Sequence, residues 1–247
     1  GRPGDKVILR GFEPNRATQT RSVDIIRFAD GTEIVAESIE PTGRTAMNGD
    51  EGGWLYGTLF ADTLIGGDGD DVLDGRGGAD RLVGGAGSDT YIIHKAWGSR
   101  PAETLIAETW RAQDTNRIQL TGEINAGALR LEFDGRDLLL RLTEEGDAIR
   151  FAGFDPRAEG MQAPVSEISL PWRGVNLSFD DLLSRGVRII GTPGNDVLTG
   201  TALADWIEGR EADDTMSGGA GRDLYVIDAD GGTDTIIDTE EGDAPNT

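Results

Sequence analysis

The stretch from Gly66 to Ile92 reads GGDGDDVLD, GRGGADRLV and GGAGSDTYI, which are three nonapeptides in direct succession. Each begins with glycine and has aspartate sixth and a large apolar residue eighth. The nine residues before them, GTLFADTLI, keep the first glycine, the aspartate and the leucine. The pattern returns from Gly191 as GTPGNDVLT, GTALADWIE, GREADDTMS and GGAGRDLYV. The chain therefore contains eight nonapeptides in two blocks, and a fixed period of this kind predicts a stacked repeat fold.

Each nonapeptide divides into a turn and a short strand. Glycine permits the positive φ angles that tight turns use. The last three residues, such as those at 72–74, alternate polar and apolar side chains as a strand does. The eighth positions are all apolar or aromatic, so they can fill one narrow core: Leu64, Leu73, Leu82, Tyr91, Leu198, Ile207, Met216 and Tyr225.

This pattern resembles the RTX family, which comprises secreted bacterial proteins with haemolysin-type calcium-binding repeats. The resemblance implies that two nonapeptides form one right-handed coil, so that residue i lies against residue i+18. Stacked strands are about 4.8 Å apart. Aspartates are then brought together in four pairs: Asp62 with Asp80, Asp71 with Asp89, Asp196 with Asp214, and Asp205 with Asp223.

Paired carboxylates at this spacing favour a bound cation. They repel each other by about 1 kcal/mol in water and by about 3 kcal/mol at an effective dielectric constant of about 20. A cation between the two carboxylates makes the net electrostatic interaction attractive. Calcium–oxygen distances suit the gap, and we expect about four to six Ca²⁺ ions bound to the eight paired aspartates. The resemblance implies further ligands by backbone carbonyl from the first four turn positions: Gly66, Gly67, Asp68, Gly69, Gly84, Gly85, Ala86, Gly87, Gly218, Gly219, Ala220 and Gly221.

Some turns depart from this pattern and make the aspartates at 62, 205 and 214 weaker candidates. Non-glycine residues are costly at positive φ, so distorted turns are expected where glycine is replaced, at Thr58, Phe60, Arg76, Thr201, Leu203, Arg210 and Ala212.

Each block is also followed by an irregular unit. Its acid, Glu103 or Asp234, is predicted to stack under Asp80 or Asp214 and to bind calcium.

Composition limits the partners of the chain. Its 247 residues carry a net charge of −22, with 45 acidic residues. Such a chain repels nucleic acid phosphates and anionic lipids, so we expect neither as a partner, and no apolar run is long enough to span a membrane. Cysteine is absent, which excludes disulfides and thiolate metal sites. The expected partner is calcium.

The expected fold class is all-β: two short right-handed parallel β-rolls flanked by antiparallel β spacer segments, in an elongated molecule. Apolar runs near residues 117, 129, 137, 148 and 165 predict hairpins, in a small sandwich or sheet packed against the roll. Ser178 begins a capping-box pattern that predicts a helix ending at Gly186. The expected segments are a spacer end at 1–47, the first roll at 48–106, a spacer at 107–190, the second roll at 191–237 and the next spacer at 238–247.

The spacers also repeat. The sequence GFEP at 11–14 returns as GFDP at 153–156, so a unit of spacer plus block occurs more than once. No signal-peptide pattern is present at the N-terminus. We interpret the sequence as a monomeric fragment of a longer chain.

Catalytic patterns are weak. The single histidine, His94, lies beside the last turn of the first block, and no HExxH motif is present, so we expect no enzyme activity. Trp54 and Trp206 occupy seventh positions, which should face outward. They either stack on sugars or partner surfaces or pack against the spacer strands, and we favour packing.

The predicted function is that of a calcium-binding structural module of a large secreted bacterial RTX protein. The resemblance implies export through a type I secretion channel as an unfolded chain, followed by calcium-driven folding outside the cell. Two alternatives remain. One is a calcium-dependent adhesin module that binds a glycan or host-cell surface. The other is the calcium domain of a secreted RTX protease, lipase, epimerase or toxin.

Overall fold

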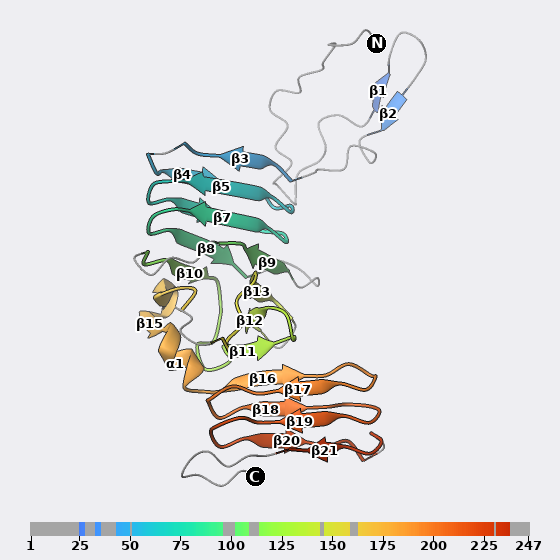
Figure 1. Cartoon of the computed structure of the whole chain (residues 1–247). Helices are drawn as coiled ribbons and strands as arrows, with labels where there is room; N and C mark the ends of the chain where they lie inside the picture. The colour runs from blue at the N-terminus through green and yellow to red at the C-terminus, as the bar shows by residue number, and fades with distance from the viewer. Residues whose placement is uncertain are drawn as a thin grey trace.

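The computed structural model describes residues 25–27, 33–35, 43–49, 51–95, 102–108, 114–143, 146–158, 163–229 and 231–237. In this part of the chain, short strands stack into an elongated column, with one block of nonapeptides toward each end (Figure 1). Most of the first spacer segment lies outside the described residues. Its described strands are β1 (Ile25–Arg27) and β2 (Glu33–Val35), an antiparallel pair, and β3 (Thr45–Met47).

The first block forms a parallel roll. Alternate strands join alternate sheets, so that β3, β5 and β7 lie in one sheet and β4, β6 and β8 in the other. Thr63 pairs with Arg81 and Val72 pairs with Thr90, which confirms the predicted offset of two nonapeptides. The strands are β4 (Trp54–Tyr56), β5 (Thr63–Gly67), β6 (Val72–Asp74), β7 (Arg81–Gly85) and β8 (Thr90–His94).

The second block repeats this arrangement. Strands β16, β18 and β20 lie in one sheet and β17, β19 and β21 in another, and Val197 pairs with Thr215 at the same offset. The strands are β16 (Val187–Ile190), β17 (Val197–Thr199), β18 (Trp206–Glu208), β19 (Thr215–Ser217), β20 (Leu224–Val226) and β21 (Thr235–Ile236).

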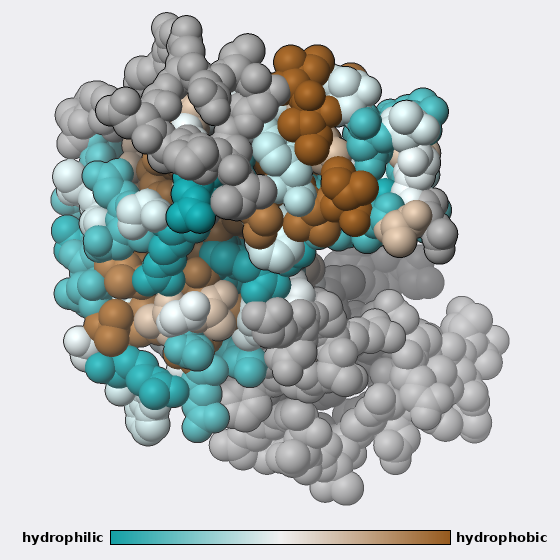
Figure 2. Space-filling model, turned by 90° about the horizontal axis from the view of Figure 1, so that it is seen from below, coloured by the Kyte–Doolittle hydropathy of each residue, from teal (hydrophilic) through white to brown (hydrophobic). Residues whose placement is uncertain are grey.

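The predicted core residues fill both rolls. Six of the eight eighth-position side chains have no exposed surface, and Leu198 and Tyr225 are partly buried against the same core. The last coil of the second roll has three isoleucines, Ile227, Ile236 and Ile237, that are each about half exposed. Figure 2 views the molecule from this end and shows apolar surface beside polar surface.

The spacer contains the predicted hairpins. Strands β11, β12 and β13 pair antiparallel, as do β14 and β15. A capping box from Ser178 begins helix α1 (Phe179–Leu183), as predicted, and the chain turns at Gly186. Strand β9 (Glu103–Ile106) ends the first roll. The other spacer elements are β10 (Arg117–Thr121), β11 (Arg130–Phe133), β12 (Leu138–Arg141), β13 (Ala148–Phe151), β14 (Glu167–Leu170), the 3-10 turn η2 (Pro171–Arg173) and β15 (Val175–Ser178).

The prediction that the spacer strands form a small sandwich or sheet packed against the roll is wrong, because these strands continue the sheets of the rolls. Strand β13 pairs parallel with β9, and β11 pairs parallel with β16. One ten-stranded sheet therefore runs from the first roll through the spacer into the second roll, while β10 and β14 extend the other sheet of the first roll. A roll ends in strand edges with unpaired backbone groups, and the spacer satisfies them by continuing the sheets. Within the described residues, no helix is long and apolar enough to cross a membrane.

Candidate metal centre

The paired aspartates are stacked by hydrogen bonds. In each pair, the backbone N–H of the first aspartate donates to Oδ1 of the aspartate that lies eighteen residues later, at 2.9 Å. The bond therefore holds the two turns in register and orients the second carboxylate. It occurs in all four predicted pairs: Asp62–Asp80, Asp71–Asp89, Asp196–Asp214 and Asp205–Asp223.

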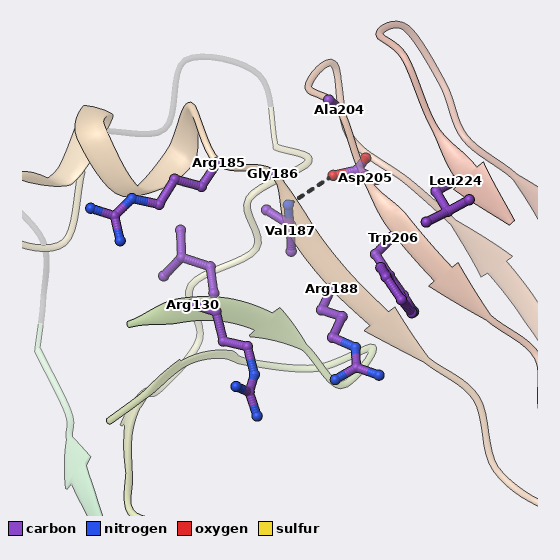
Figure 3. A pocket seen from close by; sticks show the side chains of 10 residues that line it. Arg130, Arg185, Gly186, Val187, Arg188, Ala204, Asp205, Trp206 and Leu224 are labelled. Carbon is purple, nitrogen blue, oxygen red and sulfur yellow. Dashed lines mark hydrogen bonds between the residues drawn. The ribbon is translucent and has the colours of Figure 1, made fainter. Parts of the chain in front are cut away.

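The stacks continue into the flanking turns. The N–H of Val187, just after helix α1, donates to Asp205 Oδ1 at 3.1 Å (Figure 3). The N–H of Asp214 donates to Asp234 Oδ1 at 3.1 Å, so Asp234 stacks under Asp214 as predicted. In the first roll the N–H of Asp89 donates to Asn116 Oδ1 at 2.8 Å. Sequence reasoning missed Asn116, although it precedes strand β10 as an aspartate precedes each repeat strand.

The residue after the first glycine divides the turns into two kinds. Where it is threonine, its N–H and its hydroxyl both donate to the aspartate of the same turn. In the turn of Asp205, Thr201 N and Oγ1 lie 2.6 and 2.9 Å from Oδ2. Thr58 and Thr192 make the same contacts with Asp62 and Asp196. The turn itself therefore stabilises these carboxylates. Sequence reasoning named Thr58 and Thr201 only as sites of expected distortion and missed that the three threonines donate to the aspartates.

Three of the other turns leave an aspartate oxygen without a donor among the described residues. Oδ2 of Asp71, Asp89 and Asp214 is buried and accepts no hydrogen bond within the described part of the chain. A buried carboxylate oxygen is costly unless a partner or a cation compensates its charge. These three aspartates are therefore the strongest candidates to bind a cation, and Asp214, which was expected to be a weaker candidate, is among them.

The surroundings of these oxygens fit calcium. The carbonyl oxygen of Gly84 and Oδ2 of Asp71 would lie 2.2 and 2.4 Å from a Cβ built on Gly66, so only glycine leaves space between the two oxygens. No three acidic, histidine or cysteine side chains converge within the described residues, and the remaining ligands would have to be backbone carbonyls. An all-oxygen set of carboxylates and carbonyls is the set that Ca²⁺ prefers. Of the predicted carbonyl ligands, that of Gly67 also accepts the N–H of Ala86 at 2.8 Å.

The backbone distortion expected in turns that lack glycine is confirmed in some turns and not in others. Arg76, Arg210 and Ala212 have φ angles of 63°, 77° and 76° and are the non-glycine residues with positive φ among those described. Within the described part of the chain, the threonine turns have no non-glycine residue with positive φ. In these turns the hydroxyl of Thr58 or Thr201 accepts a hydrogen bond from the N–H of the residue two positions later, at 3.1 Å.

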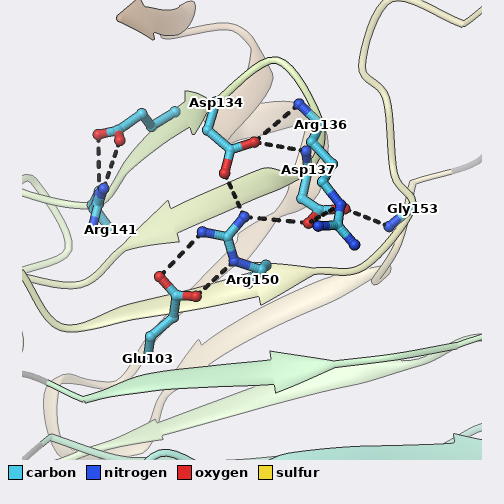
Figure 4. Close-up of polar contacts among 8 residues, drawn as sticks. Glu103, Asp134, Arg136, Asp137, Arg141, Arg150 and Gly153 are labelled. Carbon is cyan, nitrogen blue, oxygen red and sulfur yellow. Dashed lines mark hydrogen bonds and ion pairs between the residues drawn. The ribbon is translucent and has the colours of Figure 1, made fainter. Parts of the chain in front are cut away.

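The predicted stacking of Glu103 under Asp80 is wrong. The insertion after the first block shifts the register, so that Arg81 pairs with Leu105. Glu103 instead contacts Arg150 of strand β13, with Oε1 2.6 Å from Nε (Figure 4). Arg150 also pairs with Asp134 and with Asp137, so Glu103 belongs to an ion-pair cluster that ties the first roll to the spacer.

Burial changes the acidity of the stacked aspartates. It raises the pKa of Asp80 and of Asp89 to about 7, and that of Asp205 to about 6, from the ordinary value of 3.8. The negative charge of neighbouring carboxylates contributes to these raised pKa values, with Asp62 acting on Asp80, and Glu108 and Asp71 acting on Asp89. Protons and cations therefore compete for these carboxylates near neutral pH.

This competition predicts a pH dependence. The carboxyls bind protons more tightly in the folded state than in the unfolded chain, so acid stabilises the calcium-free fold, beginning as the pH falls through about 7 and complete below about 4. Circular dichroism of calcium-free protein should show more β-structure at pH ~5 than at pH ~8, while half-saturation should need more calcium at pH ~5. Less β-structure at the lower pH would contradict the assignment.

Histidine and tryptophan have structural contacts. His94 Nε2 lies 2.9 Å from Asp74 Oδ1, and Nδ1 lies 2.8 Å from Thr121 Oγ1.

Trp54 and Trp206 face outward, as predicted, with exposed fractions of 57% and 40%. The guanidinium of Arg188 covers the Trp206 ring at 5.0 Å, so this tryptophan is both partly exposed and packed against the strand next to it.

Comparison with known proteins identifies the blocks. The family description of the RTX calcium-binding nonapeptide repeat matches the chain in four copies, over residues 56–91 and 190–225. The two blocks are RTX repeats. The matched residues coincide with the eight nonapeptides to within one position. The RTX blocks thus contain all eight paired aspartates, including Asp71, Asp89 and Asp214, whose buried Oδ2 accepts no hydrogen bond from the described residues.

Among solved structures, the extracellular lipase LipA from Serratia marcescens is similar, with 18% sequence identity and a TM-score of 0.20. The alignment covers 78% of this chain and 32% of the lipase, so the chain spans about a third of that protein's length. No curated protein matches the sequence.

Proposed function

We propose that this chain is a calcium-binding structural module of a large secreted RTX protein and that calcium drives its folding after export through a type I secretion channel. The observation that supports this function is the set of buried aspartate oxygens, at Asp71, Asp89 and Asp214, that accept no hydrogen bond from the described residues. Calcium bound at these turns would compensate their charge, and the binding free energy would become folding free energy.

The charge of the whole chain supports the same function. A net charge of −22 opposes a compact state. About four to six divalent ions would add about +8 to +12. Without calcium the repulsion would keep the chain unfolded and suited to export. Outside the cell, where calcium is abundant, the same acids would bind the ion and the rolls would form.

Circular dichroism during a calcium titration tests this function. We expect a largely disordered spectrum in chelator and a cooperative change to a β-sheet spectrum at millimolar calcium. Magnesium at equal concentration is the control, because it binds dedicated all-protein oxygen cages poorly. A protein that is equally folded in chelator would show that the aspartates serve only as turn formers, and the proposed function would fail.

A second function is supported by a groove between the spacer and the second roll. It has a volume of about 270 Å³ and is lined by Trp206 together with Arg130, Arg185 and Arg188 (Figure 3). An aromatic ring beside arginines suits a sugar or a cell-surface partner, as in a calcium-dependent adhesin. A calcium-dependent glycan-array signal that is lost in Trp206→Ala would support this function, and no signal from the folded protein would exclude it for the glycans tested. We assign no catalytic activity to this chain.

A further inference from the structure

The groove between the spacer and the second roll is positive in an acidic chain. The whole sequence has 45 acidic residues and 23 lysines and arginines. The charged side chains that line the groove are three arginines and one aspartate: Arg130, Arg185, Arg188 and Asp205 (Figure 3). The aspartate is buried, and its oxygens accept hydrogen bonds from Val187 and Thr201. Most of the charge along the groove is therefore positive.

Two of the arginines lie on one face of the ten-stranded sheet. Strand β11 pairs with β16, and Glu132 lies opposite Arg188. Arg130 comes two residues before Glu132, and alternate residues of a strand share a face. Arg130 and Arg188 therefore lie on the same face of neighbouring strands, and both side chains extend in the same direction in Figure 3. Two guanidinium groups placed in this way can donate to one anion.

The arginines keep charge and donor capacity at the groove. Arg185 Nη1 donates to the carbonyl oxygens of Ala126 and Leu129 at 2.8 and 3.2 Å. These carbonyls orient the guanidinium without neutralising it. Arg188 Nη2 donates to Glu208 at 2.9 Å, but Arg188 Nε donates to no acceptor among the described residues. A guanidinium has five N–H donors, so the hydrogen-bonding capacity of Arg188 is incompletely used.

Apolar side chains lie beside these charges. Trp206 pairs with Arg188 on one neighbouring strand and with Leu224 on the other. Trp206 is 40% exposed and Leu224 is 38% exposed, and both line the groove. The groove volume of about 270 Å³ is near the lower end of the range for small-molecule sites, about 300–1,000 Å³. The groove therefore suits a small ligand that has both an anionic group and an apolar face.

We propose that this groove binds an acidic sugar. A carboxylate or sulfate on the sugar would accept hydrogen bonds from Arg130 and Arg188, because the guanidinium fork matches such oxyanions. The C–H face of the sugar ring would contact Trp206 and Leu224. The net charge of −22 does not prevent this, since charges beyond a Debye length of about 8 Å are largely screened at physiological ionic strength. The inference rests on the second proposed function and names its class of sugar.

Saturation-transfer NMR titrations of the full chain at saturating calcium test the class of ligand. Galacturonate, sulfated galactose and galactose share one ring and differ in charge. We expect at least one of the two acidic sugars to bind at least about tenfold more tightly than galactose, because charge-assisted hydrogen bonds are roughly twice as strong as neutral ones. The acidic sugar that binds more tightly distinguishes carboxylate from sulfate.

A matched pair of variants tests the site. Arg188→Gln should weaken binding of the acidic sugar at least about tenfold and leave binding of galactose unchanged. Arg173→Gln is the control, because Arg173 is exposed on η2 and is not among the residues that line the groove. It should bind all three sugars as wild type does. Should Arg188→Gln fail to fold by circular dichroism, Arg130→Gln decides: weaker binding of the acidic sugar supports the site, and unchanged binding overturns it.

The outcomes separate this inference from the proposed functions. Equal binding of all three sugars that is lost in Trp206→Ala would keep sugar binding and overturn the acidic class. No binding of any sugar by the folded protein would overturn both, and an aspartate-rich peptide that binds more tightly than the sugars would replace them as the ligand. A chain that is already folded in chelator would remove the calcium-driven folding, and the same titrations would still decide what the groove binds.

Discussion

Replacing Asp71 and Asp89 together with asparagine should weaken the calcium-induced folding of the first roll. Asparagine keeps the side-chain oxygen that accepts the stacking bond from the N–H of residue 71, so the substitution removes mainly the negative charge that would bind the ion. We expect the calcium concentration at half-saturation to rise at least about tenfold, which corresponds to about 1.4 kcal/mol. Circular dichroism during a calcium titration would measure this change.

The matched control removes the same charge from turns with threonine in the second position. The double variant Asp62→Asn/Asp205→Asn changes carboxylates that already accept the N–H and hydroxyl of Thr58 and Thr201. We expect its half-saturation concentration to change less than about threefold. Equal losses in both double variants would show that the second turn residue does not decide which aspartates bind calcium.

The second large effect is expected from a single methyl group. Gly218→Ala would place Cβ 2.0 Å from Oδ2 of Asp223 and 2.6 Å from the Tyr225 hydroxyl oxygen. These atoms are held by the stack, so the turn must open to accommodate the methyl group. We expect the calcium-loaded protein to lose about 3 kcal/mol of unfolding free energy, which lowers Tm by roughly 6–12 °C for a chain of this size. Differential scanning calorimetry at saturating calcium would measure the loss.

Gly194→Ala in the same roll is the control. The nearest atom to its added Cβ is Thr192 Oγ1 at 3.8 Å, an ordinary contact, and the backbone of Gly194 is not among those with positive φ. Its unfolding free energy should change by less than about 0.5 kcal/mol. A similar Tm decrease in both variants would mean that loss of glycine flexibility, and not the collision with the carboxylate, destabilises the turn.

The period of the sequence was sufficient to predict both rolls. Every nonapeptide carries its own turn and strand, and identical spacing leaves one register in which all the eighth-position side chains face inward. The burial of Leu64, Leu73 and Leu82 therefore followed from the local pattern. The offset of eighteen residues was implied by the resemblance to the RTX family, and the strand pairing confirms it. Asp234 was placed correctly for the same reason, since its unit is close to the repeat length.

Irregular segments could not be predicted in this way. Glu103 occupies the sixth position when residues are counted from Gly98, but the insertion before it changes the register in which β9 pairs with β7. Its carboxylate forms an ion pair with Arg150 of the distant strand β13. Asn116 and Glu108 reach the last RTX turn from outside any repeat. Their roles depend on how β9 and β10 pair with the roll, and no local spacing encodes that pairing.

The sequence by itself determined that the chain has two blocks of stacked repeats, because a repeated pattern imposes the same local structure on every copy. Its resemblance to the RTX family then implied which eight aspartates stack in pairs. Only the tertiary structure decided which carboxylates remain without a donor, since this depends on threonine contacts within the turns and on neighbours across coils. It also decided that the spacer joins the rolls in one sheet. Hydrogen bonding between distant strand edges sets that connection, and such edges look alike in any sequence of short strands.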